Sequence, residues 1–172
     1  MQYLETERLI IRLPKQDDFE ILYKIHANPQ TNVYNPSGPV KDMDEFQKTF
    51  DEWLTHHEKH RFGYYSLIDK EDNKVFGTCG LKFVLIKGVE FLNVYYRIDP
   101  SKSRRGFVKE AASAIIENVL AELDNNYQVV ALTLDQNIPS RKTAESLGLV
   151  HNPELDNYEG KGNVYYFSNN EV

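Results

Sequence analysis

The sequence of 172 residues has little cysteine, no long apolar run and no excess of basic charge. Its single cysteine, Cys79, cannot form an internal disulfide or a structural zinc site by itself, and we expect it to be buried in a protein of the reducing cytoplasm. The formal net charge of −6 argues against a nucleic-acid partner, which requires a strongly basic surface. No window approaches the roughly 20 apolar residues of a membrane span, and the N-terminus carries carboxylates instead of a secretory signal. We therefore expect a cytoplasmic protein with neither a membrane nor a nucleic-acid partner.

The length suits one domain with its own core, and no repeat, low-complexity tract or linker divides the chain. We therefore predict a single domain over residues 1–172. Runs rich in β-branched and aromatic residues predict strands, and the polar turn Asp69–Asn73 between two such runs predicts a β-hairpin. A further run, stopped by Asp99–Pro100, extends the hairpin to an antiparallel meander. The predicted strands cover residues 8–13, 64–68, 75–84, 91–98, 129–134 and 163–167.

Apolar residues at steps of three and four predict four helices. The first should be capped by Asp17 or Asp18, and the fourth should begin at Asn137 and end at the left-handed Gly148. The second runs from Met43 to about His57, and the third, with the clearest apolar stripe, from Val108 to Leu123. Because the third helix lies between strands 91–98 and 129–134, we expect these two strands to be joined by a parallel crossover.

Four cations surround one glycine just ahead of the third predicted helix: Lys102, Arg104, Arg105 and Lys109 flank Gly106. The first N–H groups of a helix have no intrahelical partner and lie at the positive end of its dipole. With a glycine beside them, such groups favour binding of an anion such as phosphate. A solvated basic loop explains the same residues equally well, since one glycine matches neither a Walker loop nor the dinucleotide fingerprint.

Three histidines lie near the end of the second predicted helix, at positions 56, 57 and 60. Their order, His-His-Glu-Lys-His, departs from the inverted zinc motif, so we expect a solvated helix end and no metal site. The aromatic stripe on the same helix, which includes Trp53, should pack in the core.

Five segments share the order and spacing of one known family. They are LETERLIIRLPKQDD (4–18), GYYSLIDKEDNKVFGTCGL (63–81), YYRIDP (95–100), RRGFVKEA (104–111) and NIPSRKTAESLGL (137–149). Together they resemble the GNAT superfamily of acyl-CoA-dependent N-acetyltransferases, specifically the branch similar to ribosomal-protein alanine N-acetyltransferases. The resemblance covers nearly the whole chain. It implies an α+β fold of three layers, α/β/α, with a mixed, mostly antiparallel twisted sheet, and acetyl-CoA as co-substrate.

The resemblance also implies where the cofactor binds. The strand ending at Ile98 and the strand 129–134 should splay apart and leave a slot for the pantetheine arm, while the loop 104–109 should bind the pyrophosphate through backbone amides. Arg104 departs from the family pattern, because it stands where a glycine is usual. The implied cofactor-binding residues are Ile98, Arg104, Arg105, Gly106, Phe107, Val108, Lys109, Asn137 and Ser140.

The resemblance implies the catalytic residues less completely than the cofactor-binding residues. Many relatives have a tyrosine as general acid at the position of Ala144, so Ser140 is the candidate that protonates the departing thiolate. At the position where relatives often have a carboxylate as base, this chain has Asn93, which cannot take a proton. Glu90, or His57 through a water molecule, stays a candidate base, although Glu90 should point to the face opposite Asn93.

We therefore expect transfer of an acetyl group to a primary amine, either a protein N-terminus or a small molecule, by direct attack on the thioester. The atypical Arg104, Asn93 and Ala144 leave open an alternative: a CoA-binding module of the same fold that has lost transfer activity. An RNA-associated adaptor that uses the basic loop is a third interpretation, disfavoured by the acidic composition. The sequence leaves open which amine is the acceptor, which group is the base, and whether the protein is a monomer or a homodimer.

Overall fold

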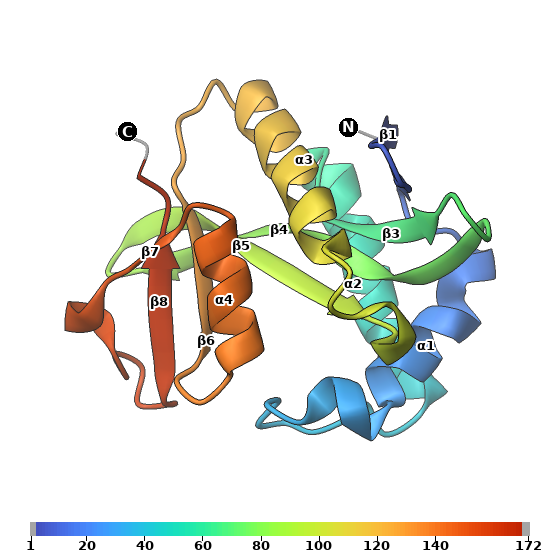
Figure 1. Cartoon of the computed structure of the whole chain (residues 1–172), viewed down its shortest axis with the longest axis horizontal. Helices are drawn as coiled ribbons and strands as arrows, with labels where there is room; N and C mark the ends of the chain where they lie inside the picture. Colours follow the sequence, from blue (N-terminus) through green and yellow to red (C-terminus); the bar gives the residue numbers. More distant parts are fainter. Residues whose placement is uncertain (1–2, 170–172) are drawn as a thin grey trace.

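The computed structural model describes residues 3–169, which form helices and strands in alternating groups (Figure 1). The strands are β1 (Tyr3–Glu5), β2 (Leu9–Arg12), β3 (Tyr64–Asp69), β4 (Lys74–Ile86), β5 (Val89–Ile98), β6 (Val129–Leu134), β7 (Val150–His151) and β8 (Asn163–Phe167). The helices are α1 (Phe19–Ala27), α2 (Met43–His60), α3 (Phe107–Glu122) and α4 (Ile138–Ser146). Short 3-10 turns include η1 (Gln16–Asp18), η2 (Pro29–Asn32) and η3 (Pro100–Lys102).

The described strands form one eight-stranded sheet in the order β1-β2-β3-β4-β5-β6-β8-β7. Neighbours are antiparallel except β5 and β6, which are parallel and joined through α3. The predicted meander of β3, β4 and β5 and the predicted crossover are therefore confirmed. The long β4–β5 hairpin keeps one register from Gly77 with Ile98 to Ile86 with Val89.

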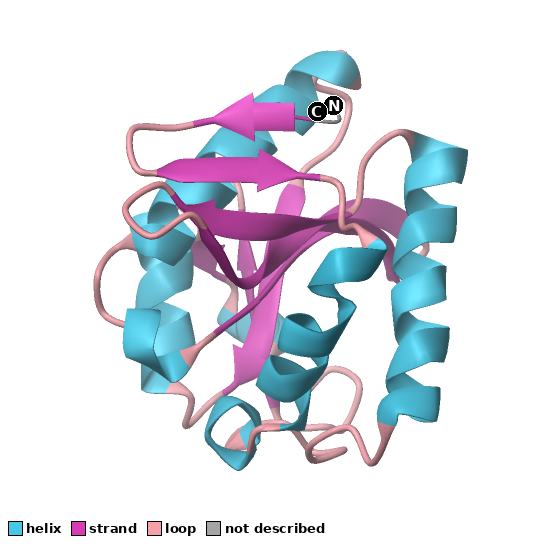
Figure 2. Ribbon diagram, turned by 90° about the vertical axis from the view of Figure 1, so that its right-hand side faces the viewer, coloured by secondary structure: helices cyan, strands magenta, loops and turns pink. Residues whose placement is uncertain are grey.

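Helices cover both faces of the sheet, as expected for the three-layer α+β fold (Figure 2). On one face, α3 and α4 pack through Ile115 and Ala144 against the largest buried cluster. On the other face, the aromatic stripe of α2 packs with α1 around Trp53, which is 2% exposed. The aromatic stripe therefore lies in the core, as predicted. None of the helices among residues 3–169 is both long and apolar enough to cross a bilayer.

Two expectations about local structure are wrong. Asp18 lies at the start of α1 but does not cap it, because its buried carboxylate accepts hydrogen bonds from Arg12, the Lys15 N–H and the Ser66 hydroxyl. The end of α2 is not fully solvated either. The His57 Nε2–H donates to the Tyr64 carbonyl oxygen at 2.6 Å, and His57 is only 7% exposed.

The edge strands β1 and β7 were not expected from the sequence, because segments of three and two residues are too short for a period-two pattern. Other local predictions are confirmed. Gly148 ends α4 with φ +80°, and Cys79 is fully buried. Burial raises the pKa of the Cys79 thiol to about 12, so this cysteine is no nucleophile at neutral pH.

Candidate active site

The central feature of the candidate site is an opening between β5 and β6. The two strands pair only at Leu92 with Val129 and at Asn93 with Val130, and they diverge beyond these pairs. The Leu92 N–H donates toward β6, to the Gln128 carbonyl oxygen at 3.0 Å. Because backbone groups alternate between the two edges of a strand, the N–H and C=O groups of Val94, Tyr96 and Ile98 also face this edge. They face the opening instead of a strand, so the splayed slot that the sequence implied is present.

The turn between η3 and α3 lies at the far end of this free edge. Arg104 has φ +61° and Gly106 has φ +78°, so both adopt the left-handed conformation. Gly106 is the N-cap of α3, and it provides no side chain to accept from the first N–H groups of the helix. These N–H groups are therefore left for solvent or an anion. Arg104 carries a Cβ in this left-handed conformation, which strains its backbone.

The cations around this turn do not all remain available to a ligand. The Lys102 ammonium pairs with Asp69 at 2.8 Å and with Asp72 at 3.0 Å, which fixes η3 against the β3–β4 turn. Arg105 contacts the exposed Glu71 at 3.5 Å. Arg104 and Lys109 are exposed. The basic character of the turn therefore depends on Arg104, Arg105 and Lys109, while Lys102 is structural.

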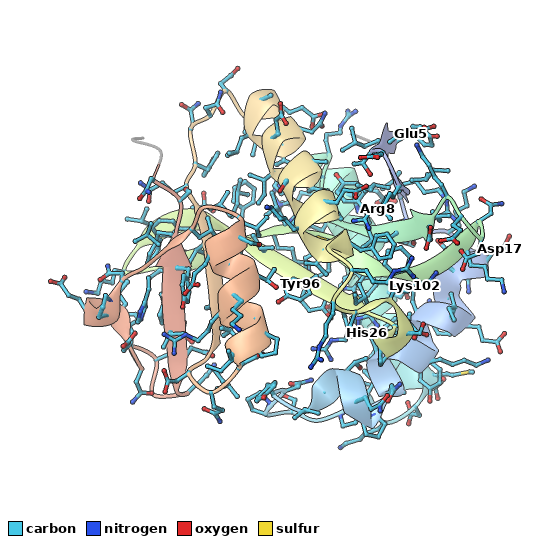
Figure 3. All side chains as sticks on the ribbon, in the orientation of Figure 1. Glu5, Arg8, Asp17, His26, Tyr96 and Lys102 are labelled. Carbon is cyan, nitrogen blue, oxygen red and sulfur yellow. The ribbon has the colours of Figure 1, made fainter. Side chains whose placement is uncertain are left out.

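Sequence reasoning did not find Arg8, which lies beside the start of α3 (Figure 3). Its Nε donates to Glu110 at 2.7 Å, and its Nη1 donates to the Arg105 carbonyl oxygen at 2.8 Å. The Arg8 guanidinium also lies over the Phe107 ring, 4.3 Å from the centroid. No local signal marks Arg8, because its partners are about a hundred residues away in the chain. It orders the turn, while its charge is paired with the Glu110 carboxylate.

The first turn of α4 faces β5 across the opening and supplies two of the expected residues. The Asn137 side chain caps this helix by accepting from the Ser140 N–H at 3.2 Å, as predicted. Tyr96 lies on β5 beside α4 (Figure 3), and its hydroxyl is 2.6 Å from the Ser140 hydroxyl. Burial raises the pKa of the Tyr96 phenol, although hydrogen bonds with Ser140 and Thr143 act in the opposite direction. Tyr96 is therefore protonated at neutral pH.

The other face of β5 carries Asn93, Tyr95 and Arg97, which point toward α1 and η2. The Tyr95 ring stacks on Tyr64 with centroids 4.5 Å apart, and its hydroxyl donates to His26 Nε2 at 2.9 Å. The His26 Nδ1–H donates to the Leu22 carbonyl oxygen, and burial lowers the pKa of His26 to about 4. This histidine is therefore neutral at pH 7.

Arg97 and Asn93 complete this second face. The Arg97 guanidinium donates to the Asn32 carboxamide oxygen. Asn32 is itself held by bonds from its amide nitrogen to the carbonyl oxygens of His26, at 2.9 Å, and Asn28, at 2.8 Å. The Asn93 Oδ1 atom is buried and accepts no hydrogen bond within residues 3–169.

The two candidate bases lie away from the opening. Glu90 is exposed and pairs in register with Leu85, near the hairpin end of β5. Six residues of strand separate it from Tyr96, which corresponds to about 20 Å. His57 lies on α2 and lines a cavity with Glu122 and Leu123, at the C-terminal end of α3. The structure thus brings Ser140, Asn137 and Ile98 to one opening and leaves Glu90 and His57 outside it.

An α/β/α sandwich with two splayed parallel strands, and with a left-handed turn opening the helix between them, defines an acyl-CoA-dependent acyltransferase class. Residues 8–150 match the family described as acetyltransferase (GNAT) domain. The chain belongs to this family of N-acetyltransferase enzymes, which use acyl-CoA. The expected family is therefore confirmed.

Individual relatives agree with this assignment. An uncharacterized N-acetyltransferase, p20 of Bacillus licheniformis, is 27% identical over 98% of this chain and 96% of its own length. The crystal structure of an acetyltransferase from Agrobacterium tumefaciens superposes with a TM-score of 0.83 at 21% identity, covering 99% of this chain and 95% of the other. The ribosomal-protein-S5-alanine acetyltransferase of Vibrio fischeri has the same fold, with a TM-score of 0.73 at 17% identity, covering 98% of this chain and 96% of the other.

Proposed function

We propose that this enzyme transfers an acetyl group from acetyl-CoA to a primary amine, on a protein N-terminus or a small molecule. The observation that carries the proposal is the free edge of β5, which leads from the opening to the left-handed turn at the start of α3. CoA joins a diphosphate to an extended arm of amide groups that ends in a thiol. The amide groups of the arm are suited to pairing with this edge, and the diphosphate is suited to the turn.

The cofactor contacts follow from that match. The diphosphate accepts from the backbone N–H groups of the 104–109 segment, where the helix dipole and three cations favour it. Phe107 contributes only its backbone, since its side chain is 2% exposed and belongs to the core. The backbone of Ile98 pairs with the pantetheine arm. Asn137 uses its carboxamide oxygen as a cap, so its NH2 group is the donor that remains for the arm.

The reaction is a direct displacement at the thioester. The amine lone pair forms a bond to the carbonyl carbon, whose oxygen accepts from an N–H on the free edge of β5. The carbon–sulfur bond then breaks, and the sulfur leaves with the bonding electrons. The Ser140 hydroxyl gives the thiolate its proton while it takes one from the Tyr96 phenol at 2.6 Å, and solvent then returns a proton to the Tyr96 oxygen. Tyr96 thereby takes the place of the tyrosine that Ala144 cannot provide.

The proton released by the amine has no carboxylate to receive it at Asn93, and Glu90 lies too far along the strand to act directly. This arrangement favours an acceptor that is already partly neutral. An α-amino group has a pKa of about 7.7 to 8.0, against about 10.4 for a lysine side chain. We therefore propose α-amines, with water as the proton acceptor, as the preferred class.

The test is release of free thiol from acetyl-CoA, measured with α-amines and matched lysine-type amines, with mass spectrometry to locate the acetyl group. Saturable transfer to an α-amine is the expected result. The double variant Arg104→Gln/Lys109→Gln should weaken CoA binding in calorimetry. The double variant Lys48→Gln/Lys59→Gln, at two exposed positions of α2, serves as a charge-matched control and should bind CoA normally.

The alternative is a CoA-binding module without transfer activity, motivated by Arg104, Asn93 and Ala144. CoA binding with no thiol release from any amine would favour that alternative. Absence of CoA binding, in calorimetry and in thermal unfolding, would contradict both.

A further inference from the structure

On the α4 side of the opening, the first turn of α4 meets β5 through the Ser140–Tyr96 hydroxyl pair, where the sulfur of CoA is proposed to lie. The opposite face of β5 is then the one left for an acceptor that approaches the thioester. That face presents Asn93, Tyr95 and Arg97, which alternate with the residues that face α4. The acceptor should therefore carry groups that complement these three side chains.

Asn93 provides a place for the amine itself. Its Oδ1 atom is buried, lacks a hydrogen-bond donor, and lies where β5 and β6 begin to diverge. A buried acceptor without a partner is uncommon in folded proteins and calls for an explanation. An incoming amine N–H supplies the missing donor beside the thioester. Asn93 thus holds the amine without taking its proton.

Arg97 provides a site for an anion. Within residues 3–169 its guanidinium has only a neutral side-chain partner, the Asn32 oxygen, and pairs with no carboxylate. Asp99, the nearest acidic residue along the chain, instead accepts from the Ser101 N–H at 2.9 Å. Lys82, in register with Asn93, lies over the Tyr64 ring at 4.9 Å, but the Glu52 carboxylate of α2 acts on it and offsets its charge. Arg97 is therefore the cation of this face that is left for an acidic group.

The spacing sets the distance between the two groups of the acceptor. The Arg97 side chain reaches back over Tyr95, with its Cζ 5.8 Å from the ring centroid. Tyr95 and Asn93 are two residues apart, which corresponds to about 7 Å along the strand. The anionic group of the acceptor then lies several bonds from its amine. An acidic side chain on the amino acid itself, or on the second residue of a peptide, satisfies this distance.

From this geometry we infer that the acceptor is an amine that also carries a side-chain carboxylate, bound by Arg97 while Asn93 receives the amine. The inference rests on the proposed acetyl transfer and names the substrate class for it. A bidentate guanidinium–carboxylate pair gives both affinity and orientation. Arg97 is therefore a specificity-determining residue of the acceptor site.

The test compares acceptors that differ only by a carboxylate and a carboxamide: glutamate with glutamine, and the peptides Ala-Asp-Ala-amide with Ala-Asn-Ala-amide. We expect kcat/KM for the acid to exceed that for its amide about tenfold to a hundredfold, mainly through KM. Arg97→Gln should abolish the preference by weakening the acid alone, and Arg97→Lys should keep part of it. A preference confined to one pair identifies whether a free amino acid or a peptide N-terminus is the acceptor.

Equal activity with acid and amide, or an equal loss with both in Arg97→Gln, would overturn the inference while leaving acetyl transfer intact. Binding of the four acceptors to the CoA-saturated protein is measured in parallel, so a protein without turnover still gives a result: equal affinities overturn the inference there too. Thermal unfolding and CoA titration of each variant verify that its fold and cofactor site are unchanged. The exposed Lys59→Gln should retain the full preference.

Discussion

The two faces of β5 differ in how firmly their side chains are held. Toward α3 and α4, the Tyr96 hydroxyl meets the hydroxyl groups of Ser140 and Thr143, beside backbone groups of β5 that pair with no strand among residues 3–169. Toward α1 and α2, Tyr95 is fixed by a stacked ring, a buried histidine and a packed aromatic cluster. One strand therefore presents an open edge and a hydroxyl pair to the proposed cofactor on one side, and on the other a firmly packed face that carries the residues proposed for the acceptor.

The difference shows how an open site can keep its geometry. The proposed pairing of pantetheine with the edge of β5 requires that β5 stay in place where β6 diverges from it. The ten-residue β5 is held by β4 along its whole length and by the aromatic cluster beneath. The four predictions below test this division, from the largest expected effect to the smallest.

Gly80→Ala should damage the rigid face most. An added methyl group would lie 2.0 Å from the Gly63 carbonyl oxygen and 2.6 Å from the Tyr64 Cα, so the backbone of β3 must move. We expect a loss of about 3 kcal/mol in unfolding free energy, measured by urea denaturation. At Gly88 a methyl group meets no atom within 4 Å, but φ is +78°. Gly88→Ala should therefore cost only about 1 kcal/mol, and equal losses would contradict this account of Gly80.

Ser140→Ala should damage chemistry on the open face without loosening the strand. Loss of the proton donor is expected to lower kcat about a hundredfold, with CoA affinity little changed. Tyr96→Phe should lower kcat less, because Ser140 remains to protonate the sulfur.

The matched control is Ser146→Ala on the same helix, whose hydroxyl bonds only to the Thr143 carbonyl oxygen at 2.7 Å. It should leave kcat unchanged. A normal kcat in Ser140→Ala would remove Ser140 from the mechanism.

Acid should weaken the rigid face through His26. The unfolded chain binds a proton at this histidine below about pH 6.5, whereas the folded protein does so only below about 4, because burial lowers the pKa of His26. Stability therefore falls as the pH drops from about 6.5 to about 4, and His26 contributes up to about 3 kcal/mol to that fall.

Urea denaturation of the protein and of His26→Gln at several pH values measures this contribution. His26→Gln should be less stable at pH 7, where its hydrogen bonds and ring contacts are lost, but should show a flatter pH dependence. An unchanged slope would show that His26 does not carry the acid sensitivity.

Arg104→Gly should have the smallest effect, and it should stabilise the protein instead of destabilising it. The left-handed backbone at φ +61° strains a residue with a Cβ, so glycine should raise the unfolding free energy by up to about 1 kcal/mol. The neighbouring Arg105 is not left-handed, so Arg105→Gly should not stabilise the protein. A gain in Arg105→Gly as large as that in Arg104→Gly would refute the role of backbone strain.

Local patterns were sufficient for most of the architecture. Long stripes predicted α2 and α3, and the order strand, helix, strand predicted the β5–α3–β6 crossover, because handedness and periodicity are local properties. The same patterns failed at Asp18. Its carboxylate had a local use as a cap, but Arg12 and Ser66 compete for it only in the folded sheet.

The residues of the candidate site also divide into those predicted from the sequence and those found only in the structure. Ser140, Asn137 and the 104–109 loop were predictable from motifs of fewer than a dozen residues. Arg8, Tyr96 and Arg97 were not, since each depends on a partner far away in the chain. Glu90 was a candidate base by sequence proximity to Asn93, but an extended strand turns a short sequence separation into a long distance.

By itself, the sequence determined the family, the strands and helices, and the glycine-poor turn at the start of α3. These features depend on residue types at short spacing. Only the tertiary structure decided which cations remain available at that turn, which hydroxyl faces Ser140, and which side of β5 receives the acceptor. Those outcomes depend on contacts between segments that are distant in the chain. Long-range packing and strand pairing determine such contacts, and local propensity does not.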